Sequence, residues 1–125
     1  MKGKNALFIE APIGVWVLLI YVASSIHAVS LPTSILGFDK AIHFSIFFVL
    51  GALIVRAFHL RGLLEHSPIW YTLTASLLAA LYGVFDEIHQ GYVPGRSVDY
   101  WDAVADAVGG IAGSITAFKA RRILR

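Results

Sequence analysis

The chain has 125 residues, of which 58% are hydrophobic and only 14% are charged, with a formal net charge of +2 and a mean hydropathy of +0.73. A soluble domain carries about 25% charged residues, so the composition excludes an ordinary soluble protein and indicates a membrane protein. There is no cysteine, which excludes disulfides and thiol nucleophiles, and the basic residues form no patch of the kind that binds nucleic acid.

Four apolar stretches follow one another, at residues 11–31, 41–58, 68–85 and 103–118. A helix of about 20 residues crosses a bilayer core, and helices satisfy their own backbone groups there. The stretches lack the alternation of a membrane β-barrel strand. We therefore predict one all-α domain over residues 1–125, a transmembrane four-helix bundle with helices at about 11–31, 41–58, 68–88 and 100–118.

The first stretch also has features of a signal peptide. Lys2 and Lys4 precede it, and small residues at Ala23-Ser24-Ser25 would suit a cleavage site. The apolar run is long for a signal peptide, however, and its removal would leave only three spans. We expect it to be a retained helix.

The basic residues predict the orientation, because cytoplasmic loops of membrane proteins are enriched in Lys and Arg. With a cytoplasmic amino terminus, eight of the ten basic residues lie on that side: Lys2, Lys4, Arg56, Arg61, Lys119, Arg121, Arg122 and Arg125. Only Lys40 and Arg96 lie opposite. We expect a multi-pass membrane protein with both termini in the cytoplasm.

Most acidic residues fall at the other, outer ends of the helices, together with His43 and His89: Asp39, Asp86, Glu87, Asp99, Asp102 and Asp106. Only 12 apolar residues follow Asp106, which is about 18 Å of helix against a bilayer core of about 30 Å. Asp106 must then lie at or below the interface. A central aspartate costs about 2.5–3.5 kcal/mol on insertion scales, so it should face protein instead of lipid.

Helical spacing predicts where these groups point. Asp99, Asp102 and Asp106 recur every three or four residues and continue into Gly109 and Gly113, a G-x-x-x-G pair that permits close helix contact. The third stretch shows a similar stripe of small residues that leads into charge: Ala75, Ala79, Tyr82, Asp86 and His89 or Gln90. Asp39 and His43 lie one turn apart on the second. We predict an outward-opening polar pocket between these three helices.

Several roles are open for these side chains. Asp39 and Asp99 suit helix caps, and His43 suits a hydrogen bond to an acid. Arg96 suits either an interfacial anchor or a grip on a carboxylate or phosphate. A divalent metal is a further candidate, because imidazole and carboxylate are its usual ligands, but the spacing matches no metal motif.

Three segments together resemble the VanZ-like family of small bacterial membrane proteins: DKAIHF at 39–44, YGVFDEIHQ at 82–90, and PGR at 94–96 followed by Asp102. The resemblance covers about residues 11–118. It implies a bacterial membrane location and, through the founding member, reduced susceptibility to teicoplanin-type glycopeptide antibiotics, but no settled activity. The signature positions are Asp39, Lys40, His43, Asp86, Glu87, His89, Gln90, Arg96 and Asp102. One position departs from the pattern, because Asp106 stands where the family often has Asn.

Three functions remain open from the sequence. The first is an enzyme that hydrolyses or transfers a group on a lipid-linked or envelope substrate, with catalytic candidates His43, His89, Asp86 and Glu87. Substrate binding would then involve Lys40, Gln90, Arg96, Asp39, Asp102 and Asp106. The second is non-catalytic binding of a lipid, peptidoglycan precursor, glycopeptide or partner protein. The third is a polar network that only stabilises the bundle.

Overall fold

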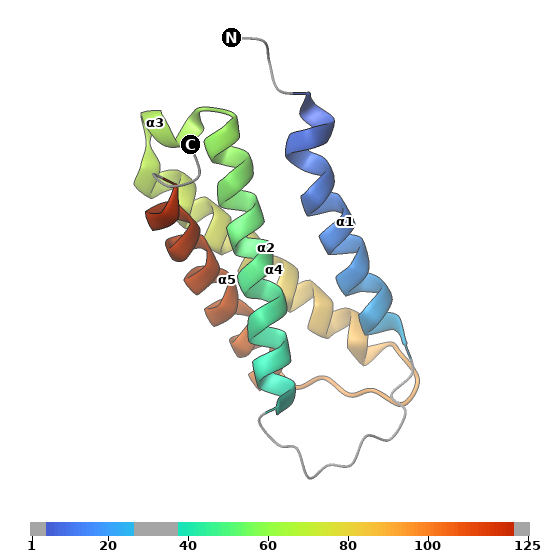
Figure 1. The fold of residues 1–125 in the computed structure, drawn as a ribbon. Coiled ribbons are helices and arrows are strands. Elements are labelled where there is room, and N and C mark those ends of the chain that lie inside the picture. The colour runs from blue at the N-terminus through green and yellow to red at the C-terminus, as the bar shows by residue number, and fades with distance from the viewer. Residues whose placement is uncertain (1–4, 27–37, 122–125) are drawn as a thin grey trace.

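The computed structural model describes residues 5–26 and 38–121, and these residues form helices and turns only (Figure 1). The helices are α1 (Ala6–Ser25), α2 (Phe38–Leu60), the single turn α3 (Leu63–His66), α4 (Pro68–Gly91) and α5 (Tyr100–Ala120). The four long helices alternate in direction, so α1 begins and α5 ends at the same end of the bundle (Figure 1). The all-α prediction is confirmed.

The helix boundaries differ from the prediction at most of the helix ends, and α2 is longer than predicted at both ends. α1 begins at Ala6 instead of 11, because the helix continues through the polar Glu10 beyond the apolar run. Of the predicted first helix, residues 27–31 lie outside the described residues. α4 extends to Gly91 because its polar last turns, with Gln90, are buried against protein. The turn α3 was not predicted.

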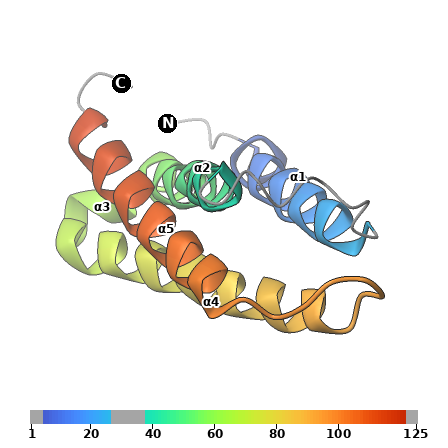
Figure 2. The same cartoon turned by 90° about the horizontal axis from the view of Figure 1, so that it is seen from below.

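Three helices are long and apolar enough to cross a membrane: Ala6–Ser25, Asp39–Leu60 and Pro68–Gly91. α5 carries Asp102, Asp106 and Lys119 and is less apolar. Its polar face is buried, since α5 packs along α2 and α4 (Figure 2). The chain is therefore a multi-pass membrane protein in which the buried acids of α5 face its neighbours.

Glycines on α5 determine how closely the helices approach. A Cβ at Gly109 would collide with the carbonyl group of Phe44, and one at Gly113 would collide with that of Phe48. On the adjacent face, a Cβ at Gly110 would lie 2.6 Å from the Cβ of Ala79. The predicted close contact of the G-x-x-x-G pair is confirmed, and its partner is α2.

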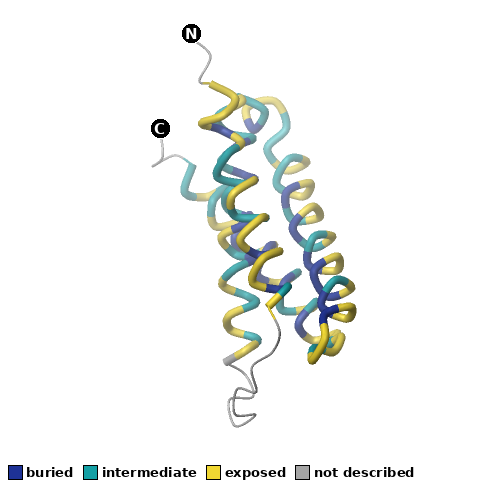
Figure 3. The backbone as a smooth tube through the Cα atoms, turned by 90° about the vertical axis from the view of Figure 1, so that its right-hand side faces the viewer, coloured by how far each residue is buried: buried dark blue, intermediate teal, exposed yellow. Residues whose placement is uncertain are grey.

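The apolar core is built mainly on α2 and α4, with Phe47, Leu50, Val55, Ala75 and Ala79, and α1 adds Ile20. Large apolar side chains also cover the outside, on α1 and α4 above all. Exposed positions run along the whole length of the bundle (Figure 3). Leu7 is 77% exposed and Leu18 is 60% exposed. Exposed apolar surface on this scale is unfavourable in water, whereas lipid solvates it.

Candidate functional site

The predicted polar residues gather at the end of the bundle where α2 begins, α4 ends and α5 begins, which we call the polar end (Figure 1). Five of them are buried: Asp86, Glu87, Gln90, Asp102 and Asp106. Asp106 has no exposed surface at all. The polar cluster comes from α2, α4 and α5, the three helices that the sequence predicted. Beside the buried acids, the small residues Ala79, Gly83 and Gly110 let α4 and α5 approach closely.

His43 lies between two groups of carboxylates. Its Nδ1 is 2.8 Å from Oδ1 of Asp106. Its Nε2 is 3.7 Å from Oδ2 of Asp102 and 3.8 Å from Oδ1 of Asp39. Asp102 and Asp106 are one turn apart on α5, and Asp39 is one turn before His43 on α2. Helical spacing therefore places all three carboxylates beside the imidazole of His43.

Lys40 neutralises the outer part of this cluster. Its Nζ donates to Oδ2 of Asp99 at 2.5 Å and to Asp102, and lies 3.7 Å from Oδ2 of Asp39. The hydrogen bond from Lys40 lowers the pKa of the Asp99 carboxyl, and the Trp101 backbone N–H, which donates to the same side chain at 2.9 Å, lowers it further. The predicted cap at Asp99 is confirmed. Asp39 is instead an exposed residue in the first turn of α2.

Asp86 is held by hydrogen bonds from two sides. One oxygen accepts from the hydroxyl of Ser24 on α1, and the other accepts from Nε2 of Gln90 at 3.0 Å. Ser24 was missed as a site residue, because a serine within an apolar run shows no helical period. Its signal was its polar side chain near the polar end of an otherwise apolar helix.

Two buried carboxylate oxygens have no hydrogen-bond partner among the described residues. Glu87 accepts the Asp99 backbone N–H on Oε2 at 3.0 Å, but its Oε1 is unpartnered. Oδ2 of Asp106 is likewise unpartnered, although Oδ1 contacts His43. Buried polar atoms are nearly always paired, so these two oxygens require an explanation.

Glu87 and Asp106 also belong to a set of four residues whose side chains are typical metal ligands. His43, Asp86, Glu87 and Asp106 each place one ligand-type atom within 4.8 Å of the others. Asp39, His43 and Asp102 form a second such set. The second set already contains the Lys40 ammonium, whereas the first set has no lysine or arginine bonded to it among the described residues. We call the first set the inner carboxylate group.

His89 and Arg96 lie apart from the inner carboxylate group. The His89 ring stacks on Tyr21 with a centroid distance of 4.5 Å, and its Nε2 is 2.8 Å from the Ser25 hydroxyl. Arg96 donates from Nε to the Ile26 carbonyl at 3.0 Å. His89 therefore attaches the last turn of α4 to the end of α1, and Arg96 attaches the segment after α4 to the residue that follows α1. Of the two residues that the α4 stripe allowed, Gln90 and not His89 enters the cluster.

The cluster is packed with its own side chains. Cavities of about 510 and 320 Å³ are present, but both are lined by other residues. A pocket that opens outward from the cluster stays a prediction.

Comparison with known proteins gives one result. No curated protein and no solved structure matches the chain. The family model VanZ/LLP1 matches residues 8–122, which include nearly all of α1 and the whole of α2 to α5. Together with the buried aspartate and histidine cluster and the membrane-spanning helices, this match shows that the chain belongs to the VanZ/LLP1 family.

Proposed function

We propose that this protein binds a divalent cation in the inner carboxylate group and uses it in hydrolysis or group transfer on a lipid-linked or envelope substrate. The observation that carries the proposal is the pair of buried, unpartnered oxygens on Glu87 and Asp106. A buried carboxylate without a partner is costly, and a metal ion is one of the few groups that compensates several at once.

The charge of the group supports a divalent ion. Three carboxylates face one imidazole, so even a protonated His43 leaves two negative charges uncompensated. Lys40 does not supply them, because Asp99 and Asp102 already engage it. Imidazole suits Zn²⁺ and Fe²⁺ and carboxylate suits Mn²⁺, so the mixed ligand set is compatible with any of these three ions.

Such an ion lowers the pKa of a bound water and polarises carbonyl or phosphoryl oxygens. The residues around it have separable roles. Ser24 and Gln90 hold Asp86 in place, and the Asp99 N–H holds Glu87. Lys40 holds the outer acids together, which favours a positioning role over the predicted grip on a substrate head group. His43 lies where it can bind the ion or move a proton between the two carboxylate sets.

Non-catalytic binding is the second candidate function. Its support is the burial of the cluster, because Glu87 is 3% exposed and Asp106 is fully buried. A centre of this kind would hold the bundle in a shape that recognises a lipid, a lipid-linked precursor, a glycopeptide or a partner protein. Metal binding without any turnover of such molecules would favour this function.

The metal centre is tested by measuring bound metal on detergent-purified protein after exposure to Mn²⁺ or Zn²⁺ and removal of excess ion. We expect one ion per chain in the wild type. Glu87→Gln and Asp106→Asn should each lower the affinity by at least about tenfold. The matched control is Glu65→Gln, which changes an exposed acid on α3. Folded wild-type protein without bound metal would contradict the proposal.

We also propose that both termini are cytoplasmic and that the polar end faces outward, on the support of the Lys and Arg distribution. Because the chain has no cysteine, single cysteines report topology directly. Tyr92→Cys, at the exposed residue after α4, should react with a membrane-impermeant maleimide in intact spheroplasts. Glu65→Cys, at the other end, should react only after permeabilisation. The reverse labelling pattern would contradict this orientation.

A further inference from the structure

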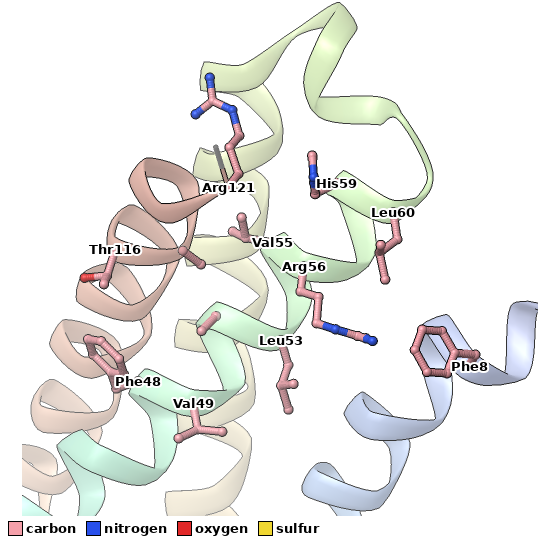
Figure 4. Close-up of a pocket in the computed structure, with 12 residues that line it drawn as sticks. Phe8, Phe48, Val49, Leu53, Val55, Arg56, His59, Leu60, Thr116 and Arg121 are labelled. Carbon is pink, nitrogen blue, oxygen red and sulfur yellow. The ribbon is translucent and has the colours of Figure 1, made fainter. Parts of the chain in front are cut away.

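A second candidate site lies at the end of the bundle opposite the polar end. A cavity of about 510 Å³ is bounded by the start of α1, the second half of α2 and the end of α5 (Figure 4). Most of its wall is apolar, with Phe8, Phe48, Val49, Ala52, Leu53 and Ala117. Its volume falls within the range of about 300–1,000 Å³ that ligand sites occupy.

Three basic side chains line one end of this cavity: Arg56, His59 and Arg121 (Figure 4). Arg56 extends from α2 toward α1, with its guanidinium carbon 5.0 Å from the centre of the Phe8 ring. Its Nη1 is buried and has no hydrogen-bond partner among the described residues. Arg121 donates from Nη1 to the Phe118 carbonyl at 2.6 Å.

No acidic residue of the described chain lines the cavity to balance these charges. Glu10, at the same end, accepts a hydrogen bond from Arg61, and Glu65 is exposed on α3. Arg56 also lies four residues before the end of α2, or about 6 Å along the helix. The unpartnered Nη1 at this position is a donor that an anionic ligand would satisfy.

We propose that this cavity binds one anionic phospholipid of the surrounding leaflet. The phosphate would bind the guanidinium of Arg56, whose Nη1 has no other partner in the described part of the chain, because a planar guanidinium offers paired donors to phosphate oxygens. Arg121, which lies over the Phe118 ring, would add positive charge on the same wall. An acyl chain would follow the apolar wall formed by Val49, Ala52 and Leu53. A lipid with a net negative head group fits best. A zwitterionic lipid would bring its own positive group into a site that already contains basic side chains and no acidic one among the described residues.

The test is native mass spectrometry of the detergent-solubilised protein with phosphatidylglycerol or phosphatidylcholine of the same acyl chains. We expect one phosphatidylglycerol per chain, bound at least about tenfold more tightly than phosphatidylcholine. The double variant Arg56→Gln/Arg121→Gln should lose this preference. Arg61→Gln is the matched control, because it removes an exposed arginine of the same end that already has a partner in Glu10.

A second variant separates lost binding from lost folding. Val49→Trp places a bulky group at the apolar wall and leaves both arginines in place, so it should weaken phosphatidylglycerol binding while melting like the wild type. Equal affinity of the wild type for the two lipids would overturn the proposal. So would a well-folded double variant that retains the preference.

Discussion

Gly113→Leu is expected to prevent the bundle from folding stably. A Cβ at this position would overlap the carbonyl oxygen of Phe48 and lie 2.7 Å from its carbonyl carbon. The clash is with helix backbone, which cannot rotate away as a side chain does, so α2 and α5 would have to separate. Overpacking typically costs about 1–3 kcal/mol and more where backbone must move. We expect a loss above about 3 kcal/mol, which is a large share of a typical stability of about 5–15 kcal/mol.

The measurement is thermal unfolding of the detergent-purified variant, followed by circular dichroism, together with its yield as a monodisperse species. Gly14→Leu is the control, because a Cβ at Gly14 meets nothing within 4 Å. It should melt at or slightly above the wild-type temperature, since leucine favours helix over glycine by roughly 1 kcal/mol. A Gly113→Leu protein that melts like the wild type would show that α2 and α5 do not pack as closely as described.

Much of the fold follows from the sequence because its signals are local. Long apolar runs predict spanning helices, and the glycines and alanines of the fourth and third stretches predict where helices touch. The ends of the helices are harder to predict. Glu10 and Gln90 are polar residues that continue a helix. Glu10 is exposed near the start of α1, and Gln90 is buried against Ser24 and Asp86.

The sequence predicts which residues of the candidate site share one face of a helix. Asp86 and Gln90, or Asp102 and Asp106, share a face because four residues make about one turn. The partners across helices were not predictable in the same way. That His89 turns to Tyr21, and that Lys40 reaches Asp99, depends on where the neighbouring helices lie. Ser24 was missed because a single serine in an apolar run has no period.

Glu87→Gln is expected to stabilise the protein in the absence of metal and to make it less stable than the wild type when metal is added. In chelator, wild-type Glu87 carries an unpartnered buried oxygen beside two other carboxylates. Glutamine removes that charge and keeps an oxygen to accept the Asp99 N–H. The variant should therefore melt above the wild type in EDTA. With Mn²⁺ at 100 times its Kd, the wild type should gain about 2.7 kcal/mol, or roughly 10 °C, and melt above the variant.

The reversal is informative because a purely structural polar network predicts no crossing of the two melting temperatures. If the polar cluster is a self-contained structural network, Mn²⁺ leaves the wild type unchanged and Glu87→Gln has the same sign of effect in both conditions. Glu65→Gln, on the exposed turn α3, controls for general effects of removing an acid and should follow the wild type in both conditions. A stabilisation by Mn²⁺ that Glu87→Gln and Asp106→Asn both abolish would tie the stability of the bundle to the ion. The two unpartnered oxygens would then be ligands, and the energetic cost of burying three carboxylates together would be offset by the ion that they bind.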